Sequence, residues 1–413
     1  MKGHNPPPQL VPKLRFPEFL DDENWVLSTI GKRCVSYSGG TPQTSKTAYY
    51  GGKIPFIRSG EIMRDMTELF LTELGLENSA ARMVKRGDVL VALYGANSGE
   101  TALARIDGAI NQAILCLRSK DNSEYIYHYL TARKNWITTT YLQGGQGNLS
   151  GQIILSVPLI LPLEKEQKKI ADCLGSLDEL ITATEQKLEA LRQHKRGLMQ
   201  HLFPQPSETV PQLRFPEFRD TPEWDLTRLT NLAKRITKRN PRGIQLRVLT
   251  NSAEHGLVDQ REYFDKKIAI NTDNYFIVEL GDYVYNPRIS TIAPVGPISK
   301  NRIGKGLISP LYMAFRFNHK SNDYFFYYFK STHWHDYVQK VSNRGARYDR
   351  IAISSMEFLQ MPVPTPSRNE QQKIANCLGS LDNLIATSEQ KLEALRQHKQ
   401  GLMQQLFPSL VKI

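Results

Sequence analysis

Two loops at equivalent places in the two halves of the chain carry side chains suited to reading DNA bases. Residues 143–150 read Gln-Gly-Gly-Gln-Gly-Asn-Leu-Ser, and residues 343–350 read Asn-Arg-Gly-Ala-Arg-Tyr-Asp-Arg. Amide side chains can form two hydrogen bonds to adenine, and a guanidinium can do the same with guanine. We therefore expect both loops to contact bases. A solvated surface loop is the equally weighted alternative.

Other polar and basic residues are candidates for DNA contacts, although a solvated surface is the more common role of any single one. Ser38–Pro42 and Tyr50–Lys53 are glycine-containing turns that let backbone amides approach a ligand, and Lys234–Arg242 holds a basic run that suits phosphates. Arg288 follows a turn at an expected strand end. The complete candidate set is Thr41, Lys46, Lys53, Arg58, Asn97, Gln143, Gln146, Asn148, Lys234, Arg235, Lys238, Arg239, Arg242, Arg288, Asn343, Arg344, Arg347, Tyr348 and Arg350.

No motif supports catalysis, cofactor binding or metal binding by this chain. The sequence has no G-x-x-x-x-G-K-[ST] phosphate loop, no G-x-G-x-x-G turn and no Pro-Asp of the usual nuclease set. Glu185–Lys187 and Glu389–Lys391 have a nuclease-like Glu-x-Lys spacing, but they lie in expected helices as solvated flanks. Asn286–Ile289 resembles an adenine-methyltransferase loop but lacks the second proline and the aromatic that stacks on a flipped base.

The composition favours a polyanionic partner and a reducing compartment. The formal net charge is +12, and the second half carries most of it. The cysteines form no zinc-like pattern, so we expect four reduced thiols at Cys34, Cys116, Cys173 and Cys377. There is no apolar run long enough to span a membrane, and Met1–Pro12 has no signal-peptide core. We expect a cytoplasmic protein without a membrane partner.

The sequence contains an internal repeat. Val11–Phe19 returns as Val210–Phe218, and Trp25 returns as Trp224. A longer copy closes each half, because residues 166–204 and 370–408 are identical at 31 of 39 positions. Between these copies the halves share only faint echoes, such as a Gly-Asp at residues 87–88 and 281–282.

The copied segments have the 4,3 spacing of apolar residues that is typical of a coiled coil. Polar residues interrupt each seam twice, at Thr184 and Lys195 and at Ser388 and Lys399, where they would cost stability and specify the register. The apolar seam positions are Ile170, Leu174, Leu177, Ile181, Leu188, Leu191, Leu198, Leu202, Ile374, Leu378, Leu381, Ile385, Leu392, Leu395, Leu402 and Leu406.

We therefore predict an α+β fold in which two domains of mixed strands and helices are separated by two long helices, with a pseudo-twofold internal repeat. Connectivity favours an antiparallel coiled coil. A helix of about 33 residues spans about 50 Å, or roughly 15 base pairs, so it can act as a ruler between two half-sites. The predicted parts are domain 1 (1–163), helical region 1 (164–204), domain 2 (205–365) and helical region 2 (366–413).

The arrangement resembles the specificity subunits of type I restriction-modification enzymes over the whole chain. The resemblance rests on Leu14–Phe19, Ser38–Pro42, Gly51–Pro55 and Asn111–Gln112, and most strongly on the two Glu-Gln-x-Lys-Ile-Ala helix starts. The endings Leu198–Pro204 and Leu402–Pro408 are similar to the subgroup usually called IC. The second domain lacks the Gly-Gly-Thr-Pro and Asn-Gln signatures, so the resemblance says less about its loops.

The resemblance implies two target-recognition domains, each reading one half of a split, asymmetric DNA site. It also implies that the helical regions bind two modification subunits, which use S-adenosylmethionine to methylate adenine, and that restriction subunits join to translocate and cut DNA with ATP and Mg. The chain itself is then non-catalytic and binds no cofactor. Two other hypotheses stay open, which are a coiled-coil scaffold for protein partners and a self-sufficient methyltransferase or nuclease.

Overall fold

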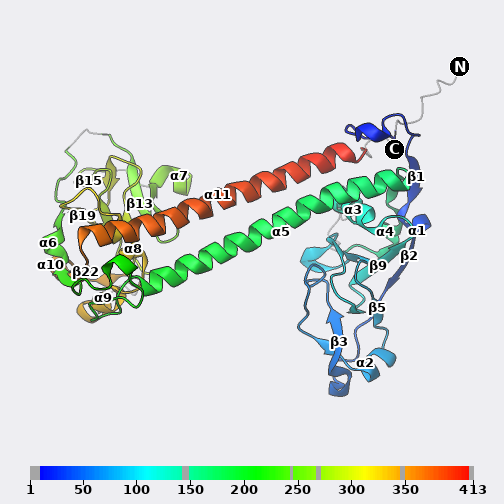
Figure 1. The fold of residues 1–413 in the computed structure, drawn as a ribbon, viewed down its shortest axis with the longest axis horizontal. Coiled ribbons are helices and arrows are strands. Elements are labelled where there is room, and N and C mark those ends of the chain that lie inside the picture. Colours follow the sequence, from blue (N-terminus) through cyan, green and yellow to red (C-terminus); the bar gives the residue numbers. More distant parts are fainter. Residues whose placement is uncertain (1–9, 142–147, 242–244, 267–270, 345–348, 409–413) are drawn as a thin grey trace. The chain divides into compact units, whose positions relative to one another are not determined.

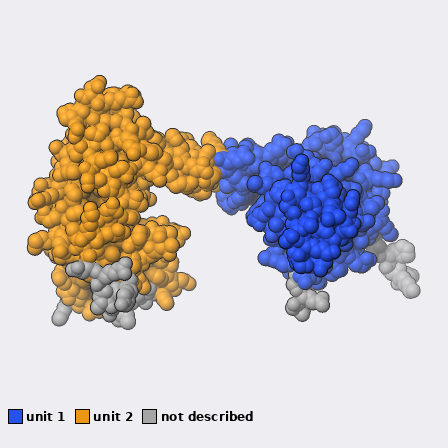
Figure 2. Space-filling view, turned by 90° about the horizontal axis from the view of Figure 1, so that it is seen from below, with its two compact units in different colours: residues 1–186, 390–413 blue, residues 187–389 orange. Residues whose placement is uncertain are grey.

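The computed structural model describes residues 10–141, 148–241, 245–266, 271–344 and 349–408, and it is a mixed helix-and-strand fold as the sequence predicts (Figure 1). These residues form two compact units (Figure 2). Unit 1 comprises Met1–Gln186 and Gln390–Ile413, and unit 2 comprises Lys187–Glu389. The division between the units crosses both long helices, whereas the sequence-based division separates helices from globules. The latter stays a prediction.

Unit 1 contains two four-stranded sheets and a two-stranded ribbon. In spatial order, the first sheet is β2 (Cys34–Ser38), β9 (Ile114–Ser119), β6 (Val89–Ala92) and β7 (Thr101–Leu103). The second is β4 (Phe70–Leu71), β3 (Tyr50–Ile57), β8 (Gly108–Ile110) and β5 (Arg82–Val84), and the ribbon is β1 (Val26–Thr29) with β10 (Pro158–Leu161). The short helices are α1 (Ile30–Arg33), α2 (Glu73–Glu77) and α4 (Gly151–Ser156), and α3 (Ser123–Tyr141) is longer.

Unit 2 repeats this topology although its sequence has diverged. Its first sheet is β12 (Ala233–Arg235), β19 (Met313–Phe317), β16 (Tyr283–Tyr285) and β17 (Ile298–Lys300). Its second is β14 (Gly256–Asp259), β13 (Val248–Ser252), β18 (Gly306–Ile308) and β15 (Phe276–Val278), and its ribbons are β11 (Asp225–Arg228) with β22 (Pro362–Thr365) and β20 (Asn343–Arg344) with β21 (Ile351–Ala352). The helices are α6 (Leu229–Leu232), α7 (Gln260–Phe264), α8 (Asp323–Lys330), α9 (His335–Val341) and α10 (Ser355–Leu359).

The central strand of each first sheet is buried on both faces. In β6, Val89 and Val91 face the helix side of the sheet, while Leu90 and Ala92 face the core beside the second sheet. In unit 2, Tyr283 and Val284 divide between two cores in the same way. Burial on both faces explains why the sequence shows continuous apolar runs here and no alternation. The apolar runs of the sequence predict strands at Val89–Tyr94, Ala113–Leu117, Tyr283–Tyr285 and Leu311–Phe317, and β6, β9, β16 and β19 confirm them. The aromatic runs Tyr125–Leu130 and Tyr324–Phe329 predict helices that pack on the sheets, and α3 and α8 confirm these.

The faint Gly-Asp echo marks a shared turn. Gly87 and Gly281 both have a φ of +89°, which favours glycine. The following aspartates cap the turn and hold an arginine on the neighbouring strand, since Asp88 accepts from Arg118 at 2.7 Å and Asp282 from Arg316 at 2.6 Å. Arg118 lowers the pKa of Asp88 although burial opposes it. The echo therefore reflects a structural requirement of the sheet.

Two unbroken helices, α5 (Glu164–His201) and α11 (Arg368–Leu406), carry the copied segments. Every seam residue named from the sequence is buried or half-buried. In unit 1, Asp178 pairs with Lys399, and Glu185 pairs with Arg396. The later residue of α5 thus pairs with the earlier residue of α11, so the two helices run in opposite directions. Unit 2 repeats the two pairs with the roles of the helices exchanged, as Lys195–Asp382 and Arg192–Glu389. The antiparallel direction is confirmed, and the polar seam lysines find carboxylates.

The repeated Arg-Phe-Pro-Glu-Phe segment binds the start of the helix that ends its own half. Arg15 donates two hydrogen bonds to Glu166, at 2.9 and 2.8 Å, and both side chains are almost fully buried. Arg214 binds Glu370 in the same way in unit 2. A second, exposed pair follows in each half, Glu18 with Lys169 and Glu217 with Lys373. The two repeated motifs thus form one contact, made twice.

The far end of each helix enters the core of the other half's globule. Phe407, at the end of α11, packs in unit 1 against Tyr125 and Tyr129, with ring centroids 5.6 and 5.5 Å apart. Phe203, which follows α5, packs in unit 2 against Tyr324 and Tyr328. Each unit therefore needs residues from both halves of the sequence to complete its core.

Glycines in the long helices are not required by packing, and this gives a stability prediction. An added Cβ at Gly197 or Gly401 meets nothing within 4 Å. We expect Gly197→Ala and Gly401→Ala each to stabilise the protein by about 0.5–1 kcal/mol, because glycine costs that much in a helix interior. Thermal unfolding measures the effect. Gly39→Ala is the control and should destabilise, since its Cβ would lie 1.8 Å from the Ile110 oxygen. A lower melting temperature for the helix variants would contradict the prediction.

Candidate nucleic-acid interface

In unit 1, the loop after β6 is hydrogen-bonded to Asn148 and Leu149, which belong to the predicted base-reading loop. The Leu149 N–H donates to Leu93 O at 2.8 Å, and Asn148 Oδ1 accepts from Gly95 N at 3.5 Å. Leu149 is buried, while Asn148 is exposed. Asn97 lies in the same short 3-10 turn, Gly95–Asn97, so the structure brings together two of the predicted residues. Gln143 and Gln146 lie outside the described residues.

In unit 2, the corresponding loops join through backbone hydrogen bonds. The Ile289 N–H donates to Asp349 O at 3.0 Å, and the Ile351 N–H donates to Pro287 O at 2.9 Å. These bonds bring the predicted residues Arg288 and Arg350 into a β-bridge. The predicted residues Asn343 and Arg344 form β20 beside β21. Arg242, Arg347 and Tyr348 lie outside the described residues.

A pair of buried asparagines holds the unit 2 loop. Asn251 donates to Val284 O at 2.7 Å, and Asn286 donates to Asn251 O at 2.9 Å. The Asn286 side chain also accepts from the Arg288 N–H at 3.1 Å. Sequence reasoning missed Asn251 because its partners are more than 30 residues away.

The basic run of unit 2 lies at a sheet edge. Lys234 and Arg235 are exposed on β12, the edge strand of the first sheet, and Lys238 and Arg239 follow it, also exposed. Backbone bonds hold the run, since Lys238 O accepts from the Ile277 N–H at 3.0 Å. Arg239 lies over the Phe276 ring. The side chains are thus available for phosphates on a fixed backbone.

The remaining unit 1 candidates lie near β3 and β2, in other contacts. Thr41 donates to Gln112 Oε1 at 2.8 Å, which joins the Gly-Gly-Thr-Pro and Asn-Gln signatures. Lys46 donates to the Tyr49 hydroxyl at 3.1 Å, and Lys53 is exposed on β3. Exposed Tyr94, which directly precedes the turn of Asn97, was not among the candidates, although it follows the apolar strand β6.

Arg58 differs from the other candidates because carboxylates already occupy its guanidinium. It donates to both oxygens of Glu61 at 3.0 Å and also binds Glu68. Burial raises the pKa of Glu61, but the hydrogen bonds from Arg58 and from two backbone N–H groups outweigh it and lower that pKa to about 2. This geometry favours a structural role.

The depressed pKa of Glu61 makes the stability of unit 1 depend on pH. Because the folded pKa lies below the ordinary value of 4.5, the carboxylate stabilises the fold above that value and loses this effect as the pH falls toward 2. We expect Glu61→Gln to cost about 2–3 kcal/mol at pH 7. The difference from the wild type should shrink between pH 4.5 and 2 in denaturant unfolding. A pH-independent difference would show that the charge is not responsible.

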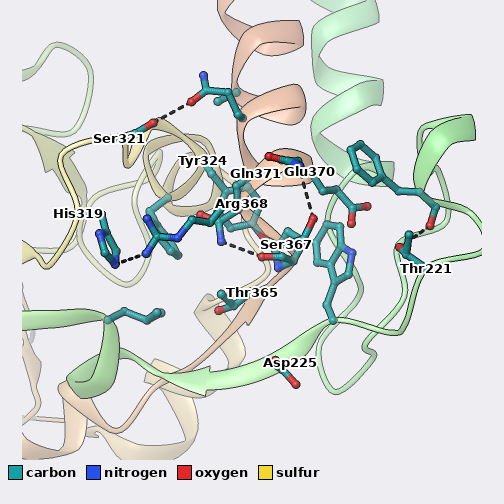
Figure 3. A pocket seen from close by; sticks show the side chains of 18 of the residues that line it. Thr221, Asp225, His319, Ser321, Tyr324, Thr365, Ser367, Arg368, Glu370 and Gln371 are labelled. Atoms are coloured by element: carbon teal, nitrogen blue, oxygen red, sulfur yellow. Dashed lines mark hydrogen bonds between the residues drawn. The ribbon is translucent and has the colours of Figure 1, made fainter.

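Unit 2 also has a pocket of about 990 Å³ where its N-terminal segment, its first sheet and the start of α11 meet (Figure 3). Ser367, Arg368 and Glu370 gather at the helix start, and Ser321 donates to Gln372 at 2.8 Å. Arg368 contacts His319. None of the described DNA candidates lines this pocket, so it is distinct from the loops.

The part of the chain that the structure describes contains neither a candidate metal site nor a candidate membrane-spanning helix. No cluster of His, Cys, Asp or Glu among those residues could hold a metal ion. None of the described helices is long and apolar enough to cross a bilayer. The cysteines are free, and burial raises the pKa of Cys34 and of Cys116 to about 11, which disfavours reactive thiolates.

Two globules of one topology, each with a pair of polar loops held by buried contacts, define an internally duplicated protein. Comparisons with known proteins identify its family. The sequence model for "Type I restriction modification DNA specificity domain" matches residues 22–193 and 249–397. The chain therefore belongs to the family of type I restriction-modification specificity subunits.

Individual relatives carry the same description, and solved structures share the fold. The chain is 22% identical to the type I restriction enzyme MjaVIII specificity subunit of Methanocaldococcus jannaschii, over 95% of this chain and 94% of the relative. It is 25% identical to the EcoR124I/EcoR124II specificity subunit of Escherichia coli, over 44% and 49%. The S subunit from M. genitalium superposes with a TM-score of 0.57 at 15% identity, over 97% of this chain and all of that one. A chain from a study of type I R-M complex assembly and conformational transition gives 0.54 at 16% identity, over 93% and 98%.

Proposed function

We propose that this chain selects the DNA sequence for a type I restriction-modification complex, and that each unit reads one half of a split, asymmetric target. One observation supports this above all. The two units share a topology, but their equivalent loops carry different side chains, with Asn97 and Asn148 in unit 1 and Arg288 and Arg350 in unit 2. Different side chains at equivalent places recognise different bases.

The partner subunits carry out the chemistry in this proposal. Two modification subunits bind S-adenosylmethionine and methylate adenine, and restriction subunits use ATP and Mg to translocate and cut DNA. This chain binds no cofactor, contacts double-stranded DNA and acts in the cytoplasm. The unbroken helices α5 and α11 set the length of the gap between the two half-sites, because a helix has a fixed rise per residue. The near identity of the two copied segments supports this role.

An exchange of recognition regions tests the division of labour. Residues 231–360 are replaced by the matching region of a relative, and the chimaera is expressed with its cognate modification subunits in a host. Sequencing that detects methylated adenine should show a change in one half of the motif only. A matched chimaera that replaces residues 32–156 should change the other half.

A second arm tests the helices. Insertion of four residues, about one helical turn, into both α5 and α11 should lengthen the unread gap and leave the half-site bases unchanged. If the insertion changed the bases, or if either chimaera changed both halves, the proposed division would be wrong.

A further inference from the structure

One arginine in unit 2 combines high exposure with a rigidly held backbone. The Arg288 side chain is 68% exposed. Its backbone is fixed on both sides, because its N–H binds Asn286 Oδ1 and its neighbour Ile289 binds Asp349 O at 3.0 Å. The buried Asn286 thus positions the backbone of the loop, while the long side chain of Arg288 points to solvent.

The support beneath this loop extends into the core. Tyr285, at the end of β16, stacks on Phe358 with ring centroids 4.6 Å apart. Gly296 has a φ of +81° and approaches the Asn286 carbonyl so closely that a Cβ would lie 2.1 Å away. The backbone that carries the Arg288 side chain is therefore held in one place, which direct base reading requires.

The guanidinium of Arg288 is also uncommitted compared with the structural arginines. Arg316 and Arg214 each make two hydrogen bonds to a buried carboxylate. Among the described residues, Arg288 makes no side-chain hydrogen bond, and its ion partner is Asp349 at 3.6 Å. Asp349 also lies 3.9 Å from Arg350. One carboxylate therefore lies near two arginines, and no hydrogen bond among the described residues engages the Arg288 guanidinium.

We propose that Arg288 reads a guanine in the major groove of the half-site bound by unit 2, with Asp349 as the residue that positions it. The planar fork matches O6 and N7 of guanine, and no other base offers two acceptors there. The inference rests on the proposed function and adds to it the chemical identity of one base. A phosphate contact is the competing role of an exposed arginine.

Replacement by lysine separates the two roles, since lysine keeps the charge but lacks the fork. The full chain carrying Arg288→Lys or Arg288→Ala is assembled with its modification subunits, and methylation is mapped by sequencing. We expect both variants to lose discrimination at one guanine of one half-site by roughly 5- to 150-fold, with the other half-site unchanged. Arg302→Lys is the matched control, because Arg302 is 57% exposed and lies 3.7 Å from Asp323.

The outcomes are distinguishable. If Arg288→Ala lost methylation equally at all sequences while Arg288→Lys kept normal methylation, Arg288 would contact a phosphate, and the inference would be overturned. If both variants abolish methylation, the affinity of the assembled variant complex is measured for two duplexes that differ only at the guanine in question. Equal affinity supports the inference, and a retained preference for guanine rejects it. A wild-type complex without a split motif would instead reject the proposed function itself.

Discussion

Phe407→Ala is expected to destabilise unit 1 by about 3–5 kcal/mol, although Tyr125 and Tyr129, which it contacts, lie in the other half of the sequence. The Phe407 side chain is 2% exposed between Tyr125 and Tyr129. Its removal leaves a cavity between two rings that cannot collapse easily. Hydrogen exchange should show faster exchange in the β9 peptides of unit 1, with little change in the β19 peptides of unit 2.

Two controls make this result specific. Phe203→Ala should give the mirror result, with faster exchange in unit 2, because Phe203 occupies the equivalent site there. Gln404→Ala, at an exposed position of the same helical turn, should change stability by less than about 0.5 kcal/mol. Unchanged protection of β9 in Phe407→Ala would mean that the end of α11 does not belong to the core of unit 1.

Arg214→Ala should cost about 3–5 kcal/mol in unit 2, because it leaves the carboxylate of Glu370 buried without its partner. The Glu370 side chain is 1% exposed, and Arg214 also donates to the carbonyls of Thr221 and Pro222. Denaturant unfolding at neutral pH measures the loss. The exposed pair beside it is the control, and Lys373→Ala should cost less than about 1 kcal/mol.

A double variant separates the charge from the packing. Arg214→Met with Glu370→Leu removes both charges at similar volume, so it should recover much of the stability that Arg214→Ala loses. A double variant as unstable as the single one would show that the hydrogen bonds to Thr221 and Pro222 dominate. Arg15→Ala should behave as Arg214→Ala does, but in unit 1, where Trp25 also donates to Glu166 at 3.2 Å.

Much of the fold could be predicted because the sequence contains an internal repeat. The 4,3 spacing predicted α5 and α11, and connectivity predicted their antiparallel direction. The repeat of Arg15 and Glu166 as Arg214 and Glu370 was visible as two motifs. Their contact was not, because the partners lie about 150 residues apart and only folding joins them.

The candidate site was less predictable, since a side chain's role depends on what its guanidinium or amide meets. Arg58 and Arg288 look alike in the sequence, but Glu61 three residues away binds the first through two hydrogen bonds, while the second has only a longer ion contact with Asp349 among the described residues. Asn251 gave no signal at all, although it supports the loop of Arg288. The pairing of the Asn148 and Gly95 loops also depends on how the sheet aligns them.

The shared topology of the diverged regions was only faintly visible. The echo at Gly87 and Gly281 is a turn with positive φ that both sheets require, and it is one of few positions where the backbone dictates the residue. Elsewhere, Val89 and Tyr283 fill equivalent buried positions with side chains of different shape. A core accepts such changes when volume and pattern are kept, so topology outlasts sequence identity.

The most direct test of the central claim is a map of methylated adenines in a host that carries this chain with its modification subunits. We predict one split, asymmetric motif whose two halves flank a fixed unread gap, absent from a host that lacks the chain. A contiguous or symmetric motif, or no motif that depends on the chain, would contradict the claim that two unlike units each read one half of the target.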